Sequence, residues 1–298
     1  MEYGRISNTG FDALETELPP DASANEIILQ PNGLKPKLYM GCPMWGRKEW
    51  IGQIYPKGSR DNSLLDHYVK LYNAVELNAT HYNLLGRERI EEWVKAAKGR
   101  DFKFCPKVWK QISHYSGFEN AGAMTKQFLD EISAFEDHLG PLFLQTSDKF
   151  RPKHAKDKFF NYLQTWPKQV QLFVELRHPE WFSDTIFGKE LFDCLRTYKI
   201  GAVITDTPAF RERLHMELTI PKAFIRFLCK GDHPSDTKRI DAWAVRIKQW
   251  MDKGIEEVYF FVHPMETSYS PALTKYAAAQ FNKVCGAQLP EIRLQTLW

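Results

Sequence analysis

The chain has 298 residues, 43% of them hydrophobic and 26% charged, which is typical of a globular protein with a sizeable core. Its 40 basic and 37 acidic side chains leave a formal net charge of +3, which excludes a strong overall attraction to nucleic acid. The 5 cysteines are widely spaced and form no CxxC pair, so the sequence indicates neither a disulfide framework nor a zinc knuckle.

Residues 1–36 are polar, contain several prolines and lack a sustained hydrophobic period. We interpret them as an N-terminal arm that is mostly irregular, with at most one short helix. The first residues show no apolar core of a secretory signal, and nowhere does an apolar run reach about 18 residues. We therefore expect a cytoplasmic protein that makes no membrane contact.

From residue 37 onward, short apolar runs alternate with amphipathic stretches, the pattern of βα units around a parallel sheet. The apolar runs predict strands at 38–42, 74–78, 102–107, 141–146, 171–176, 200–206, 223–228 and 257–262. Apolar residues at intervals of three and four predict helices at 63–72, 87–98, 123–139, 156–166, 188–198, 239–254 and 272–284. Only the link between the sixth and seventh strands lacks a long helix. The pattern predicts that residues 37–298 form a single α/β domain, a TIM-type (β/α)8 barrel of eight parallel strands with a C-terminal tail.

Polar side chains gather where the predicted strands end, which is where the catalytic groups of such barrels lie. On the second strand, Glu76 and Asn78 alternate with apolar neighbours and should face the interior. The other residues at or just after strand ends are Trp45, Thr80, Tyr82, Lys107, Gln145, Glu175, Arg177, His178, Trp181, Asp206, Arg226 and His263. Buried charges are costly unless they are paired or used, so this convergence indicates a site. A pair such as Asp206 with Arg226 has an alternative interpretation as a structural ion pair that plugs the barrel.

Two segments, VELNATHY at 75–82 and VELRHPEWF at 174–182, together with FKFCPK, GPLFLQ, VITDTP and IRF, resemble the family called domain of unknown function 72. The similarity extends through nearly all of residues 38–285, and it implies a TIM-type barrel without a settled activity. The polar positions that match the family are Glu76, Asn78, Thr80, Tyr82, Lys107, Gln145, Glu175, Arg177, His178, Trp181, Asp206 and Arg226.

The chain departs from the family pattern in three loops. The first strand ends in GCPMW where GTSGW is usual, the seventh leads into Cys229-Lys230-Gly231, and the eighth ends in His263-Pro264 where Asn-Asn is usual. We expect these loops to recognise a different ligand.

The residue types predict an enzyme of the hydrolase, lyase or isomerase kind that acts on a small anionic, sugar-like or phosphorylated substrate. The predicted catalytic residues are Glu76, Lys107, Glu175, Arg177 and Asp206, with Glu76 or Glu175 as general base. Lys107, Arg177 and Arg226 would hold negative charge. The predicted substrate-binding residues are Trp45, Asn78, Thr80, Tyr82, Gln145, His178, Trp181, Arg226 and His263.

Three alternatives stay open. A divalent metal would use Glu76, Glu175, Asp206 and His263, but the nearby cations oppose it and no HxH or HExxH spacing occurs, so no metal residue is assigned. A nucleic-acid-binding or phosphodiester-processing protein would stack bases on its exposed aromatic rings. A non-catalytic module that binds a metabolite would use the same residue types. The sequence carries no signal for an oligomeric state.

Overall fold

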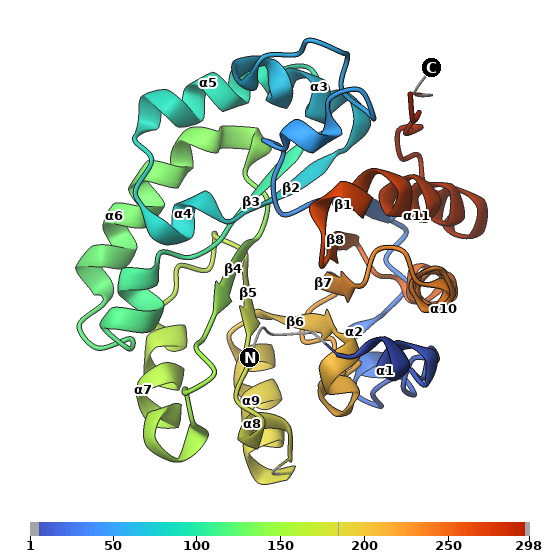
Figure 1. The fold of residues 1–298 in the computed structure, drawn as a ribbon. Coiled ribbons are helices and arrows are strands. Elements are labelled where there is room, and N and C mark those ends of the chain that lie inside the picture. Colours follow the sequence, from blue (N-terminus) through green and yellow to red (C-terminus); the bar gives the residue numbers. More distant parts are fainter. Residues whose placement is uncertain (1–5, 184, 296–298) are drawn as a thin grey trace.

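The computed structural model describes residues 6–183 and 185–295 as an arrangement of parallel strands with helices around them (Figure 1). The strands are β1 (Lys37–Gly41), β2 (Ala74–Leu77), β3 (Lys103–Pro106), β4 (Leu142–Gln145), β5 (Leu172–Glu175), β6 (Gly201–Asp206), β7 (Lys222–Cys229) and β8 (Glu257–Pro264). The helices are α1 (Asn8–Asp12), α2 (Asn25–Ile28), α3 (Leu64–Leu71), α4 (Ala79–Tyr82), α5 (Arg87–Ala97), α6 (Gly122–Ile132), α7 (Pro152–Gln164), α8 (Glu180–Ser183), α9 (Thr185–Thr197), α10 (Pro234–Lys253) and α11 (Ser270–Cys285). Every strand except β6 leads into a helix, as the sequence predicts.

Six strands form one parallel sheet in the order β1-β8-β7-β6-β5-β4, and β2 pairs with β3 in a second parallel sheet. The two sheets meet at both of their edges. At one edge the amide of Glu76 donates to the carbonyl of Cys42 at 3.1 Å, and at the other the amide of Val108 donates to the carbonyl of Phe143 at 2.9 Å. Chain order and spatial order therefore agree along both sheets, as expected for successive βα units.

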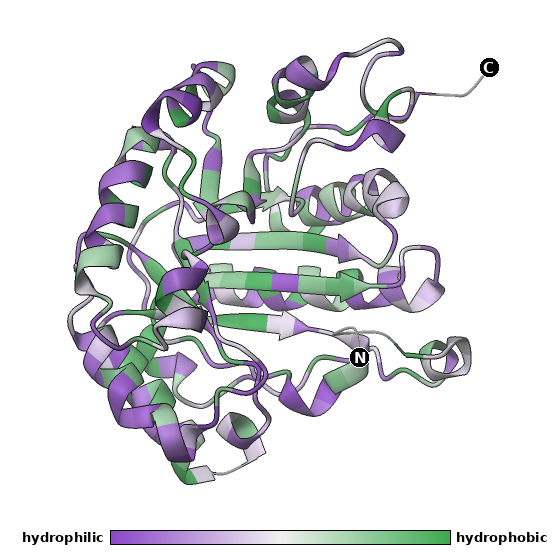
Figure 2. Cartoon of the chain, turned by 60° about the vertical axis from the view of Figure 1, so that its left-hand side comes forward, coloured by the Kyte–Doolittle hydropathy of each residue, from purple (hydrophilic) through white to green (hydrophobic). Residues whose placement is uncertain are grey.

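The strands are buried on both faces, which explains why they read as apolar runs (Figure 2). One face packs against the helices. The other encloses an interior cluster to which every strand from β1 to β8 contributes, made of Tyr39, Ala74, Cys105, Phe143, Phe173, Val203, Ile220, Phe224, Tyr259 and Phe261. At Gly41 in β1, a Cβ atom would lie 1.9 Å from the carbonyl oxygen of Ala74 in β2. Only glycine allows β1 and β2 to approach so closely.

The outer helices begin and end at recognisable signals. In α10, the His233 side chain accepts a hydrogen bond from the Ser235 amide, and Pro234 occupies the first turn. Gly254 ends the helix with a left-handed φ of 104°. The predicted helix at 123–139 instead divides into α6 and a 3-10 segment, Ser133–His138, and within that segment Glu136 has a φ of 49° that an α-helix does not accommodate.

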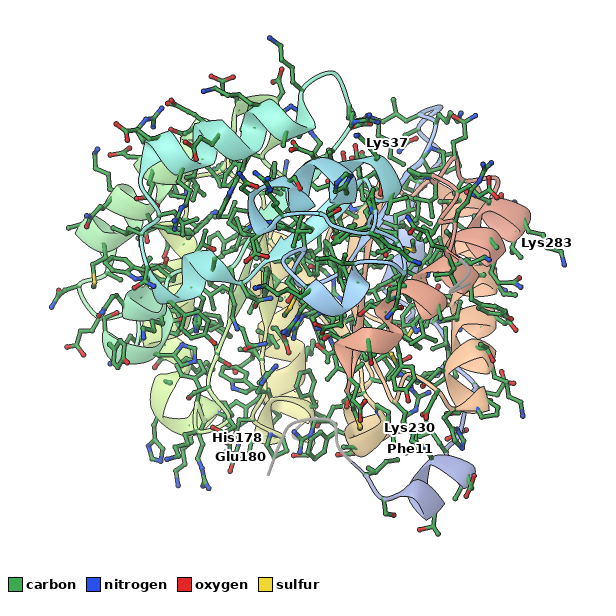
Figure 3. All side chains as sticks on the ribbon, turned by 45° about the horizontal axis from the view of Figure 1, so that its top comes forward. Phe11, Lys37, His178, Glu180, Lys230 and Lys283 are labelled. Atoms are coloured by element: carbon green, nitrogen blue, oxygen red, sulfur yellow. The ribbon has the colours of Figure 1, made fainter. Side chains whose placement is uncertain are left out.

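The N-terminal arm contains two short helices rather than one. Asn25 in α2 donates to the carbonyl of Met216 at 2.7 Å and accepts from the amide of Leu218 at 2.8 Å. Phe11 in α1 packs beside Lys230, which follows β7 (Figure 3). Among the described residues, no helix is long and apolar enough to cross a membrane.

Candidate active site at the C-terminal ends of the strands

A layer of polar side chains lies above the apolar interior at the C-terminal ends of the strands. Each of these residues follows an interior apolar residue by two positions, so both point inward. The pairs are Ala74 and Glu76, Cys105 and Lys107, Phe143 and Gln145, Phe173 and Glu175, Phe224 and Arg226, and Phe261 and His263. The alternation of the strands thus gathers polar side chains from six separate parts of the chain.

Arg226 joins opposite sides of this layer. Its Nε and Nη2 atoms donate to Oε2 and Oε1 of Glu76 at 2.9 and 3.0 Å, and its Nη1 donates to Oε2 of Glu175 at 2.8 Å. One guanidinium on β7 therefore connects a carboxylate on β2 with a carboxylate on β5. The two-pronged contact with Glu76 is a strong charge-assisted arrangement that fixes orientation as well as position.

Glu76 is completely buried and saturated with donors. Besides Arg226, it accepts from Nδ2 of Asn78 at 3.0 Å and contacts Nε2 of His263 at 2.9 Å. Burial alone would raise the pKa of Glu76, yet Arg226 and His263 outweigh that effect and hold the pKa well below its usual value. Burial lowers the pKa of His263, although Glu76 opposes the shift.

Glu175 has a second set of partners that extends to Lys107. Its carboxylate accepts from Nε2 of Gln145 at 2.7 Å and from Nε of Arg177 at 3.2 Å. Gln145 in turn accepts from Nζ of Lys107 at 2.8 Å. Burial would raise the pKa of Glu175, but the attraction of Arg226 and Arg177 dominates and lowers it to about 2.

These contacts join Asn78, Glu76, His263, Arg226, Glu175, Arg177, Gln145 and Lys107 into one network. Lys107 differs from its other cations, Arg226 and Arg177, because its protonation can change near neutral pH. Burial and the neighbouring charge of Arg226 lower its pKa to about 8, against the opposing attraction of Glu175 and Glu76. A group with such a pKa can both donate and accept protons under physiological conditions.

The network has a buried floor and a more open rim. The side chains of Glu76 and Glu175 are 0% and 2% exposed, whereas those of His263 and Arg177 are 14% and 21% exposed. Two carboxylates face three cations, Arg226, Lys107 and Arg177, so the network carries an excess of positive charge while Lys107 is protonated. The more exposed end therefore favours a negatively charged ligand.

The model of the family described as "Protein of unknown function DUF72" matches residues 39–294. The chain belongs to the DUF72 family. This finding confirms the resemblance seen in the sequence motifs around Glu76 and Glu175.

Two curated relatives of this DUF72 protein carry UPF0759 names. The chain is 25% identical over 273 residues to UPF0759 protein YecE of Escherichia coli, an alignment that covers 86% of the chain and 95% of YecE. It is 22% identical over 160 residues to UPF0759 protein YunF of Bacillus subtilis, which covers 52% of the chain and 55% of YunF.

Solved structures of DUF72 proteins share the fold. A structure from Enterococcus faecalis superimposes with a TM-score of 0.62 at 18% identity, over 85% of this chain and 99% of that one. A structure from Thermotoga maritima gives a TM-score of 0.60 at 20% identity, over 83% of this chain and 98% of that one.

Asp206, predicted to be catalytic, lies outside this network in the DUF72 chain. It has the same orientation as Ile204, whose side chain packs in the outer core between sheet and helices. Its carboxylate accepts from Nη2 of Arg239 at 2.7 Å and from Nε1 of Trp243 at 2.8 Å, both on α10, and it also pairs with Arg211. These contacts fasten β6 to α10 on the outside of the strands.

Two tryptophans predicted to bind substrate are packing residues in the structure. Trp181 is fully buried, stacks on Phe150, and donates from Nε1 to the carbonyl of that residue at 2.8 Å. Trp45 is half-buried and packs edge-on against Trp93, with ring centroids 4.9 Å apart. Neither ring belongs to the polar layer.

Two further predicted residues organise the loops around the site. The hydroxyl of Thr80 contacts the carbonyls of Leu77 and Lys107 at 2.9 and 2.8 Å, so it ties the loop after β2 to the end of β3. His178 accepts from the amide of Glu180 at 3.2 Å at the start of α8. The structure therefore places both at the site's border, without a bond to the network.

Sequence reasoning missed three residues at this end of the strands. Lys110 and Tyr115 follow β3 in a loop without hydrophobic periodicity, so no pattern marks them. Nζ of Lys110 lies near the ring of Tyr115 and near the exposed ring of Tyr82, which was predicted. Thr205 points inward and is paired in register with Arg226. Its hydroxyl is buried without a hydrogen-bond partner within the described part of the chain. No signal in the sequence marks it, because the residues of β6 before Thr205 are apolar on both faces of the strand.

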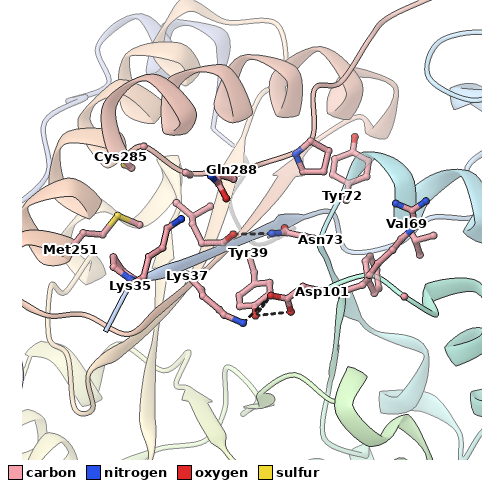
Figure 4. A pocket seen from close by; sticks show the side chains of 18 residues that line it. Lys35, Lys37, Tyr39, Val69, Tyr72, Asn73, Asp101, Met251, Cys285 and Gln288 are labelled. Carbon is pink, nitrogen blue, oxygen red and sulfur yellow. Dashed lines mark hydrogen bonds and ion pairs between the residues drawn. The ribbon is translucent and has the colours of Figure 1, made fainter. Parts of the chain in front are cut away.

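A cavity of about 650 Å³ lies at the opposite, N-terminal end of the strands. Figure 3 separates the two ends, with Lys37 far from His178 and Glu180. In this cavity, Asp101 pairs with Lys37 at 2.9 Å and accepts from the hydroxyl of Tyr39 at 3.0 Å (Figure 4). The size of this cavity does not make it the active site, because the inward polar side chains of six strands converge at the other end.

The polar layer offers little to a metal ion. All four carboxylate oxygens of Glu76 and Glu175 accept hydrogen bonds from side chains. Over residues 6–183 and 185–295, no cluster of three or more His, Cys, Asp or Glu side chains is arranged to hold a metal. The donor set therefore fits an anion better than a cation.

Proposed function

We propose that this DUF72 protein is an enzyme that binds a small anionic substrate at the C-terminal ends of its strands, within a closed (β/α)8 barrel. The observation that carries the proposal is the arrangement of Lys107 and Arg177 above two fully engaged carboxylates. The closing of the barrel is supported by the hydrogen bonds at both sheet edges and by the interior cluster to which all of β1 to β8 contribute.

The charge of the network supports an anionic substrate. Glu76 and Glu175 neutralise much of the charge of Arg226, and two further cations, Lys107 and Arg177, belong to the same network. A phosphate or carboxylate group placed between them would complete the charge balance of a site with little water. Arg177 is also the more exposed of the two, which suits the first contact with a ligand.

Lys107 is the best candidate for proton transfer. The carboxylates of Glu76 and Glu175 have low pKa values and saturated oxygens, so they are weak bases and serve in this proposal to position Arg226, Asn78 and Gln145. With a pKa of about 8, Lys107 exchanges protons near physiological pH. Such a group suits hydrolase, lyase and isomerase reactions, in which a proton moves to or from the reacting substrate.

The experiment that tests this proposal compares wild type with Lys107→Met and Arg177→Ala in a mixture of cellular metabolites, followed by untargeted mass spectrometry. Wild type should deplete one or a few phosphorylated or carboxylated compounds. Lys107→Met should stop the depletion while it retains measurable binding of the compound, and Arg177→Ala should weaken binding at least tenfold, which corresponds to about 1.4 kcal/mol.

Exposed residues elsewhere provide matched controls. Lys126→Met on α6 and Arg89→Ala on α5 remove the same charges from the outer surface, so both should behave as wild type. If the compound binds and wild type leaves it unchanged, the protein is a binding module rather than an enzyme. If only polynucleotides bind, with an affinity that falls steeply between about 50 and 200 mM salt, the nucleic-acid alternative replaces the proposal.

A further inference from the structure

The rim of the polar layer carries a cation between two exposed aromatic rings. Nζ of Lys110 lies 5.5 Å from the ring centroid of Tyr82 and 5.5 Å from that of Tyr115. These tyrosines are 58% and 67% exposed, although most aromatic side chains of the protein are buried. Tyr82 follows β2 and Tyr115 follows β3, so both stand at the end of the strands where the network lies.

The loop that presents Tyr115 has an unusual backbone. Residues Gln111–Tyr115 form a π-helical turn, in which the amide of Ser116 donates to the carbonyl of Gln111 at 2.9 Å. Phe118 and Asn120 then adopt left-handed φ values of 72° and 50°. Such turns are rare and occur frequently at functional sites, as do non-glycine residues in the left-handed region. The fold therefore maintains a costly loop shape that holds the ring in place.

Two histidines lie near the cations of both the network and this rim. The rings of His81 and His114 lie 5.0 Å apart between the two regions. Burial lowers the pKa of His81 to about 4, with Lys107 contributing, and burial, Lys107, Arg177 and Lys110 lower the pKa of His114. The lowered pKa values favour the neutral form of both imidazoles, so the positive charge near a ligand comes from Lys107 and Lys110.

We propose that Tyr82, Lys110 and Tyr115 form an outer subsite that binds a flat ring attached to the anionic group of the substrate. This inference rests on the proposed function, because it assumes that Lys107 and Arg177 hold the anionic end. The substrate class is then a phosphate or carboxylate joined to an aromatic ring or a nucleobase. Tyrosine faces stack on such rings with little dependence on ring identity, and Lys110 attracts their electron-rich faces and any second negative charge.

The test measures binding of phenyl phosphate, cyclohexyl phosphate and methyl phosphate by isothermal titration calorimetry. Wild type should bind phenyl phosphate about tenfold more tightly than methyl phosphate, a preference within the range known for ring stacking on aromatic side chains. Cyclohexyl phosphate, which is apolar but not flat, should resemble methyl phosphate. Tyr82→Leu and Tyr115→Leu, which keep an apolar side chain, should each reduce the preference for the phenyl ring to about twofold.

The controls separate this inference from the proposed function. Leu34→Ala removes an exposed apolar side chain in the N-terminal arm and should change none of the three affinities. Equal binding of phenyl phosphate, adenosine 5′-monophosphate and methyl phosphate to wild type, with all three weakened by Arg177→Ala, would overturn the subsite and leave the proposed function intact. A phenyl preference that survives both tyrosine substitutions would also overturn it. If Arg177→Ala and Lys107→Met change no affinity, the proposed function fails and the subsite fails with it.

Adenosine 5′-monophosphate, titrated in parallel, distinguishes a nucleobase from a simple aromatic ring. Either compound that binds more tightly than methyl phosphate, and loses that advantage in Tyr115→Leu, supports the subsite and identifies which ring it prefers.

Discussion

Replacing Glu175 with Gln tests whether the buried network depends on charge. The substitution preserves the shape of the side chain but removes the negative charge that faces Arg226 and Arg177. The pKa of Glu175 falls from an ordinary 4.5 to about 2, and this difference contributes about 3 kcal/mol to the free energy of unfolding at pH 7. We expect Glu175→Gln to lower the free energy of unfolding by at least that much, because the substitution also leaves the buried cations Arg226 and Arg177 less well paired.

The effect should depend on pH in a defined direction. Because folding lowers the pKa of Glu175, its contribution is complete above about pH 5 and is lost as the pH falls toward 2. At pH 3 less than half of it should remain, so the difference between wild type and Glu175→Gln should shrink by about 2 kcal/mol between pH 7 and pH 3.

Urea unfolding at pH 7, 5 and 3 measures this difference, with Glu88→Gln on the exposed face of α5 as the matched control. A loss below 1 kcal/mol at pH 7, or a difference that stays constant from pH 7 to pH 3, would refute the assignment of a charged, paired Glu175.

Three further predictions concern other parts of the structure. Phosphate binding to wild type should weaken as the pH rises through about 8, where Lys107 loses its charge, whereas the phosphate affinity of Lys107→Arg should stay constant to about pH 10. If calorimetry shows the same pH dependence for both proteins, the role of Lys107 is contradicted. Asp206→Asn should lower the free energy of unfolding, measured in urea, by about 3–5 kcal/mol without weakening phosphate binding to the folded protein. Unchanged stability with weakened phosphate binding would instead indicate that Asp206 belongs to the active site. Gly41→Ala should prevent stable folding, as monitored by circular dichroism, because the added Cβ would overlap the carbonyl of Ala74. Gly46 has open space around it, so the control Gly46→Ala should melt at the same temperature as wild type. If Gly41→Ala melted at that temperature too, β1 and β2 would have to lie farther apart than described.

The order of the strands and the convergence of polar residues at their ends were predictable from the sequence. Apolar runs predicted the strand positions to within one or two residues, and the alternation along the second strand correctly predicted that the side chain of Glu76 faces the interior. Glu175, Gln145 and Arg226 follow the same alternation, and the structure brings them into one hydrogen-bonded network. The alternation along each strand was sufficient for this prediction, because polar side chains that point inward from neighbouring strands lie close together in the interior.

The orientation of β6 was not predictable in the same way. Its residues are apolar on both faces until the strand ends, so the sequence shows no alternation from which to decide whether Asp206 points inward or outward. The partner that decides the matter, Arg239, lies on α10, far along the chain. Trp181 raised a similar difficulty, because a tryptophan after a strand end serves equally well as a pocket wall or as the core of the next helix.

Loops were the least predictable part of the candidate site. Tyr115 lies in a π-helical turn that no hydrophobic periodicity predicts, Lys110 directly precedes that turn, and the contact of Lys110 with Tyr82 joins two separate loops. Such contacts depend on the three-dimensional course of the backbone rather than on local sequence preferences.

The most direct test of the central claim is a crystal structure of the protein soaked in selenate, an anion whose selenium is located by anomalous scattering. The account predicts selenate between Nζ of Lys107 and the guanidinium of Arg177, with Glu76, Glu175 and Arg226 unmoved beneath it. Selenate bound only at other basic surfaces, such as the exposed lysines of α7, would contradict the claim that the strand ends form an anion site.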